Sequence, residues 1–262
     1  MFDNFLSLDI PGEVISSLIV MGIIMILAII IGIKAHFQDP LKKPKGLLLL
    51  TEIGVNYFDN FVKELTGTAL PGFGGFIMAV AVYLFIAFIF GLTGLPSPVT
   101  YMAVPLSLGL TTFLLIHIIS VKFTKWKYFK RYIDPFPVFL PINLISMWAP
   151  LLSLTLRLFG NAIAGWALLT IVETSLREVS AKIFHFMPVL QEAQGYLPSD
   201  FLYGNWNEIF LSPIPTAILH AYFDLFSGLI QTVVFISLTA IFIGQEIPED
   251  LAYNLPERRA QV

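Results

Sequence analysis

The sequence predicts an all-α integral membrane protein with five transmembrane helices and one interfacial amphipathic helix, the last two transmembrane helices being long and strongly tilted. Hydrophobic residues make up 56% of the 262 residues and charged residues only 13%, about half of the roughly 25% typical of soluble domains. The few charges also leave several apolar runs long enough to cross a bilayer. We therefore expect one membrane domain covering residues 1–262.

The first apolar run, Val14 to Ile33, contains 20 uncharged residues. At ~1.5 Å per residue it measures ~30 Å as a helix, the thickness of one hydrocarbon core, so residues 14–33 are the first predicted transmembrane helix. The residues before it carry acids but no Lys or Arg, whereas a cleavable signal peptide begins with a positive segment. We expect this helix to remain in the mature chain.

Three further helices are predicted from the next hundred residues. Residues 46–65 place apolar side chains at helical spacing with polar ones opposite, the pattern of an amphipathic helix in the membrane interface. An ordinary soluble helix in a loop has the same pattern and remains the alternative. From Thr66 to Val121 the chain has no Asp, Glu, Lys or Arg. A Gly- and Pro-rich segment interrupts this run, which predicts transmembrane helices at 74–94 and 101–121.

The last two apolar runs are too long for one upright crossing. Pro135 to Val172 has 38 residues and Ile209 to Gln245 has 37, each ~55 Å as a helix against a ~30 Å core. Their prolines lie toward the start of each run, which favours tilted helices over broken ones. We expect long helices at 141–175 and 213–245, joined by an outer loop at 176–212.

The distribution of basic residues predicts the orientation. Segments 34–65 and 122–131 and the C-terminal tail hold 12 of the 15 Lys and Arg residues, and such residues accumulate on the cytoplasmic side. The N-terminus is therefore expected outside and the C-terminus in the cytoplasm.

Composition and motifs exclude several kinds of chemistry. The absence of cysteine excludes disulfides and thiolate metal sites, and the formal charge of -3 gives no indication of a nucleic-acid partner. The sequence has no phosphate-binding loop, no metal-ligand spacing and no nucleophile elbow. We expect no metal, no cofactor and no enzymatic activity of the chain on its own.

Each long run contains one charged residue, Arg157 in the first and Asp224 in the second. A guanidinium in the middle of a bilayer costs at least ~2.5–3.5 kcal/mol and stays protonated, so Arg157 must face a partner or water. Asp224 can avoid its charge by taking up a proton. A fixed cation and a titratable acid on two apolar helices are the ingredients of a proton path, although a structural ion pair between them is the alternative.

Polar residues accompany both charges. Asn161 lies one turn after Arg157, and His220, Asp224, Ser227 and Gln231 form one stripe on the last helix. A relay role for His220 competes with that of an interior histidine, and Asn161 and Gln231 also suit simple helix association. Ser227 is interpreted as a packing residue and His117 as structural. Glu173 and His185 are expected near the outer mouth, where solvated charges are ordinary.

The segment LTLRLFGNAIAG at 154–165 closely resembles the signature of subunit a of bacterial F-type ATP synthases. PINLI at 141–145 is similar to that family's approach to the same helix, and the spacing of Asp224 and Gln231 also resembles it. Many relatives carry Glu or His directly after the glycine matched by Gly165, whereas this chain has Trp166. The proton uptake route then relies more on Asp224, with His220 one turn away.

The resemblance implies a proton-translocating stator in a bacterial plasma membrane, with two offset half-channels facing a ring of c subunits. Arg157 matches the essential arginine between them, Asn161 a polar neighbour of it, and Gln231 the glutamine facing it. Asp224 falls where relatives place Glu or His in the outer half-channel. The implied partners are the c-ring with its membrane carboxylates, the b subunits of the peripheral stalk, the other synthase subunits and the lipid bilayer.

Two other functions are alternatives. A secondary transporter or ion channel for another solute often has internal repeats, and this sequence has none that we detect. A membrane scaffold without transport would leave Arg157 and Asp224 functionally inert.

Overall fold

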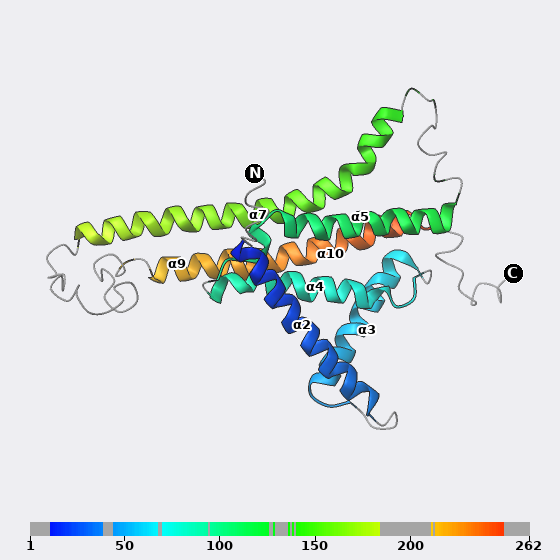
Figure 1. The fold of residues 1–262 in the computed structure, drawn as a ribbon, viewed down its shortest axis with the longest axis horizontal. Helices are drawn as coiled ribbons and strands as arrows, with labels where there is room; N and C mark the ends of the chain where they lie inside the picture. The colour runs from blue at the N-terminus through cyan, green and yellow to red at the C-terminus, as the bar shows by residue number, and fades with distance from the viewer. Residues whose placement is uncertain are drawn as a thin grey trace, which may run out of the picture.

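A computed structural model confirms the all-α membrane class. Every element in its described part is a helix, and five of these helices are long and apolar enough to cross a membrane. Four of the five lie along the long axis of the molecule, whereas α2 crosses at an angle and is accompanied by the shorter helix α3 (Figure 1). The structure describes residues 11–38, 44–67, 70–93, 95–125, 128, 136, 138, 140–183, 211 and 213–248.

The buried residues of the first helix, α2 (Gly12–His36), all lie in its N-terminal part. Ser16, Ser17 and Val20 are buried, and the Ser17 hydroxyl shares a hydrogen bond of 2.7 Å with the hydroxyl of Tyr83. Most of its other apolar side chains are exposed, as expected of a helix whose solvent is lipid.

Helix α3 (Leu47–Thr66) is bounded by two glycines with positive φ, Gly46 at 62° and Gly67 at 65°, a backbone region that other residues rarely adopt. It packs against α4 (Phe73–Ile89) at Gly74, where a Cβ would lie 2.6 Å from the Asp59 backbone. A side chain at Gly74 would therefore separate the two helices. The interfacial position of α3 stays a prediction.

Short 3-10 turns, η1 (Phe90–Thr93) and η2 (Pro98–Thr100), connect α4 to α5 (Ala103–Thr124). The main core lies where α4 and this connection meet the two long helices. Its buried residues are Leu84, Ala87, Phe88, Val99, Leu154, Leu158 and Phe235.

Helix α7 (Leu140–Ile183) has 44 residues, ~66 Å of helix and about twice a hydrocarbon core. It ends eight residues beyond the expected end at 175, so the expected loop at 176–212 begins as helix. This extension has no Gly or Pro, and the ion pair between Glu173 and Arg177, four residues apart, supports it. Residues 184–210 lie outside the described residues. Pro150 lies inside α7, and the helix bends along its N-terminal part (Figure 1).

The last run consists of α9 (Pro213–His220), a π-helical segment η5 (Ala221–Ser227) and α10 (Gly228–Gln245). It runs antiparallel to α7 and contacts it through all three parts (Figure 1). Glycines permit close contact in this region. A Cβ on Gly228 would lie 2.6 Å from that of Phe88, and one on Gly165 would lie 3.1 Å from the Phe223 ring.

Candidate functional site

Arg157 lies on an exposed face of α7. Its Nη2 donates a hydrogen bond of 3.3 Å to the hydroxyl of Ser153, one turn earlier. Among the described residues no carboxylate comes within 4.0 Å of the guanidinium. The alternative of a structural ion pair with Asp224 is therefore wrong. Since an unpaired cation in hydrocarbon is expensive, the partner of Arg157 must be water or a group outside the described residues.

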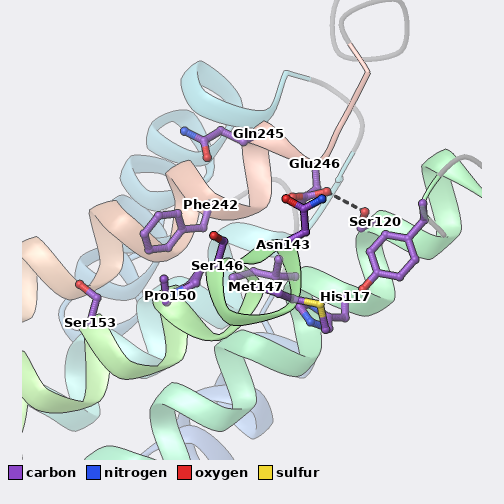
Figure 2. Close-up of a pocket in the computed structure, with 13 residues that line it drawn as sticks. His117, Ser120, Asn143, Ser146, Met147, Pro150, Ser153, Phe242, Gln245 and Glu246 are labelled. Atoms are coloured by element: carbon purple, nitrogen blue, oxygen red, sulfur yellow. Dashed lines mark hydrogen bonds between the residues drawn. The ribbon is translucent and has the colours of Figure 1, made fainter. Parts of the chain in front are cut away.

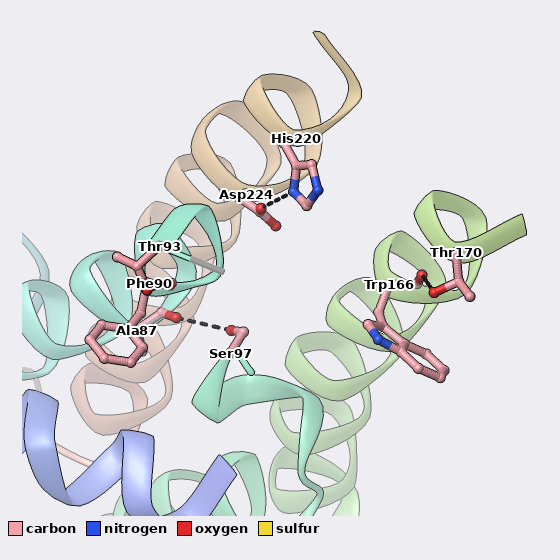
Figure 3. A network of polar contacts seen from close by, with 8 residues as sticks. All are labelled: Ala87, Phe90, Thr93, Ser97, Trp166, Thr170, His220 and Asp224. Carbon is pink, nitrogen blue, oxygen red and sulfur yellow. Dashed lines mark hydrogen bonds and ion pairs between the residues drawn. The ribbon is translucent and has the colours of Figure 1, made fainter. Parts of the chain in front are cut away.

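Asp224 is instead paired with His220. The imidazole Nδ1 lies 2.8 Å from Asp224 Oδ2, and the two side chains are 39% and 18% exposed. Both project from the α9–η5 segment on the side of α7 (Figure 3). Gly91 lies close to the Asp224 carboxylate, since a Cβ added to this glycine would lie 3.2 Å from Asp224 Oδ2. This geometry allows one proton to be shared between a carboxylate and an imidazole.

Asn161 and Ser227 join α7 to η5. The amide Nδ2 lies 2.8 Å from the serine hydroxyl, and that hydroxyl lies 3.0 Å from the amide Oδ1. Ser227, interpreted from sequence as a packing residue, therefore has a polar partner.

Gln231 does not join this network through any hydrogen bond within the described residues. Its side-chain Oε1 is buried and has no partner there. The expected stripe of four polar residues assumed regular α-helical turns. Residues 221–227 form a π-helical segment, whose wider turns change the direction of the side chains that follow. A buried amide oxygen without a hydrogen-bond donor is rare in native proteins, so a donor from outside the described residues is one explanation for Gln231.

A cavity of about 680 Å³, here called the Asp224 cavity, lies between α7 and the α9–η5 segment. Several sequence-predicted residues line it together: Asn161, Trp166, Glu173, His220 and Asp224. Glu13, from the first turn of α2, lines it as well and was missed by sequence reasoning. The sequence feature that could have identified Glu13 is its position directly before the first apolar run. His185 lies outside the described residues.

A second cavity, of about 540 Å³, lies between the first part of α7, α5 and the end of α10 (Figure 2). We call it the Ser153 cavity. Its polar lining residues are His117, Ser120, Tyr128, Asn143, Ser146, Ser153, Gln245 and Glu246. Sequence reasoning assigned no site here and interpreted His117 as structural. The His117 ring packs against Phe113 with centroids 4.1 Å apart, and it also faces this cavity.

Arg157 lies between the two cavities on α7 and lines neither of them. Ser153, four residues before it, lines the Ser153 cavity, and Asn161, four residues after it, lines the Asp224 cavity. Four residues rise ~6 Å along a helix. The Ser153 cavity, the fixed positive charge of Arg157 and the Asp224 cavity therefore follow one another along ~12 Å of the α7 axis.

Comparison with known proteins gives consistent matches over most of the chain. The family model described as ATP synthase A chain matches residues 14–244, a range that begins in α2 and ends in α10. Proteins named ATP synthase subunit a are similar to the chain. The one from Mycoplasmoides gallisepticum is 27% identical over 259 residues, covering 95% of this chain and 82% of the relative. The one from Limosilactobacillus fermentum is 28% identical over 230 residues, covering 84% and 85%.

Proposed function

Because this chain belongs to the ATP synthase A chain family, we propose that it is the stator subunit through which protons reach and leave the rotating c-ring of a bacterial F-type ATP synthase. One observation carries the proposal. Arg157 lies on an exposed face of α7 without a carboxylate partner among the described residues, and one polar cavity lies before it and another after it along the helix.

Each cavity serves as one half-channel. A proton enters the Asp224 cavity and neutralises a ring carboxylate near Asn161. The neutral carboxyl crosses the lipid at far lower cost than an anion. It ionises when rotation brings it to the Ser153 cavity, and the resulting anion is attracted to Arg157. Because this fixed cation separates the cavities, protons cannot pass without rotation. The driving force is ~2.3 kcal/mol per charge per 100 mV.

The side chains of the Asp224 cavity have distinct roles in this scheme. Asp224 and His220 exchange the incoming proton across their 2.8 Å contact. Trp166 has no titratable group and shapes the wall of the cavity. Glu173 and His185 belong to its outer mouth. Gln231, whose buried Oε1 lacks a partner within the described residues, is available to a group on the ring.

The exposed face of α7 around Arg157 suits close approach of the ring. Gly160 and Ala164 lie on this face, and a Cβ on Gly160 would meet nothing within 4 Å. Small residues let membrane helices come close together, and no neighbour in the described chain explains this glycine. Each ring subunit then brings its carboxylate within reach of the guanidinium.

The chain is a multi-pass membrane protein, and the distribution of Lys and Arg supports an outside N-terminus and a cytoplasmic C-terminus. The Asp224 cavity then opens outward and the Ser153 cavity inward. Peripheral-stalk b subunits and the c-ring are its partners in this assembly.

Replacing Arg157 tests the proposal. We expect Arg157→Ala to abolish ATP synthesis and ATP-driven proton pumping in membrane vesicles, while the water-soluble head still hydrolyses ATP. Lys182→Ala is the control, because Lys182 is an exposed cation near the end of the same helix and should leave both activities unchanged. Normal ATP synthesis by the Arg157 variant would refute the proposal.

A further inference from the structure

The Ser153 cavity contains one carboxylate among its described lining residues, that of Glu246. Glu246 directly follows α10, at the opposite end of the cavity from Ser153 (Figure 2). Its Oε2 accepts a hydrogen bond of 2.6 Å from the hydroxyl of Ser120 on α5. Ser120 is only 1% exposed, so this contact fixes the carboxylate against a buried part of the neighbouring helix.

The cavity between these two ends has room and polar groups for a chain of water molecules. Its volume of about 540 Å³ compares with ~30 Å³ for one water in the liquid. Asn143 and Ser146 lie along the wall between Glu246 and Ser153 (Figure 2). Pro150 also lines the cavity and has no N–H to donate to the carbonyl of Ser146, which is left available to water.

Resting on the function proposed above, we propose that Glu246 is the proton acceptor of the Ser153 cavity and that Ser120 positions it. A proton released by the ring carboxyl moves along the water chain past Ser153. As the last water of the chain gives up its extra proton, one O–H bond breaks there and one forms on a Glu246 carboxylate oxygen. The proton then leaves to bulk water and the carboxylate is restored.

Glu246 suits this role better than His117, the histidine among the described lining residues. His117 packs among aromatic rings, with centroids 4.1 Å from Phe113 and 6.1 Å from Tyr128. Glu246 lies where the membrane-length run ends and is half-buried. Its carboxylate is therefore placed between the cavity and the water beyond the membrane.

The test is passive proton conductance in vesicles stripped of the water-soluble head, driven by a potassium diffusion potential. Glu246→Gln keeps an acceptor for Ser120 but cannot take up a proton, so we expect conductance to fall about tenfold. This decrease is smaller than the ~10²–10⁴-fold contribution typical of a positioned acid–base group, because water molecules in the cavity still conduct protons. Glu246→Asp should restore most of the rate. The matched control is Glu52→Gln, an exposed acid on α3 outside the lining of both cavities.

A second measurement separates proton transfer from a structural effect. The chain has no cysteine, so Ser146→Cys gives it a single thiol inside the cavity, and labelling by a water-soluble reagent reports access. Reduced conductance in Glu246→Gln with unchanged labelling and rescue by aspartate supports the proposal. Unchanged conductance, altered labelling or failure of aspartate to rescue overturns it. In each case, loss of ATP synthesis in Arg157→Ala shows that the proposed function itself stands.

Discussion

At the scale of single residues, the unusual feature is a permanent cation, Arg157, that has no carboxylate partner among the described residues. The guanidinium of Arg157 has one hydrogen bond within the described residues, to a neutral hydroxyl. Asp224, the acid that the sequence offers as its partner, is occupied by His220. The chain therefore keeps its cation and its acid apart, which leaves Arg157 able to attract a carboxylate that comes from another subunit.

The pairing of Asp224 with His220 leads to a prediction. Asp224→Asn keeps a hydrogen-bond acceptor for the imidazole but cannot carry a proton, so we expect the rate of proton uptake to fall roughly tenfold or more. ATP synthesis in vesicles under an imposed proton gradient measures it. Glu64→Gln, an exposed acid on α3, should have no effect. An unchanged rate in Asp224→Asn would mean that Asp224 is structural.

The sequence identified those charged residues that lie inside apolar runs, where burying a charge in the membrane costs free energy. Arg157 and Asp224 are conspicuous because each is the one charge in a run of nearly forty residues. Glu13 and Glu246 lie at the ends of apolar runs, where charges are ordinary, and only the folded chain places each beside a cavity. The roles assigned from sequence to Asn161, Gln231 and Ser227 stay predictions.

At the scale of helices, the sequence correctly predicted five membrane-length helices, because apolar length and charge-free runs identify such helices directly. It predicted their irregularities poorly. The π-helical segment at 221–227 has no marker comparable to proline. In the folded chain His220, the last residue of α9, pairs with Asp224, and Ser227 pairs with Asn161 of α7. Pro150 lies inside the expected helix at 141–175 as it does inside α7, but the bend in the N-terminal part of that helix (Figure 1) was not predicted from the sequence.

The bend that accompanies Pro150 has a testable role. Pro150→Ala restores an N–H donor to the carbonyl of Ser146 and removes the ring that clashes with it. We expect the first part of α7 to straighten toward α5 and α10 and to narrow the Ser153 cavity. Passive proton conductance should then fall several-fold, and labelling of Ser146→Cys should slow, although no charge has changed.

Pro141→Ala is the matched control for this variant. Pro141 lies in the first turn of α7, where a proline is tolerated because its missing N–H has no helical partner. It does not line either cavity. Both measurements should match the unmodified protein, and an equal loss in the two proline variants would argue against a role for the bend.

At the scale of the whole molecule, the two cavities lie along different parts of the antiparallel helix pair, with Arg157 between their lining residues on α7. Neither cavity includes the exposed face of α7 that carries Arg157 and Gly160. Among the described residues, no residue lines both cavities, so neither cavity extends across this face to the other. Under the function proposed above, a subunit of the c-ring carries the proton across the face of α7, and this step couples transport to rotation.

Gly160 gives the test of that face, because a side chain there meets no atom of the described chain. We expect Gly160→Leu to fold and insert normally, with the helix stabilised by up to ~1 kcal/mol. The new side chain should hold the ring away from Arg157 and reduce ATP-driven pumping at least severalfold. Gly22→Leu is the control, since Gly22 lies in α2 with equally open surroundings. Pumping rates, compared at equal amounts of each variant in the membrane, should fall only for Gly160→Leu. Full pumping by that variant would place the ring contact on another face of the molecule.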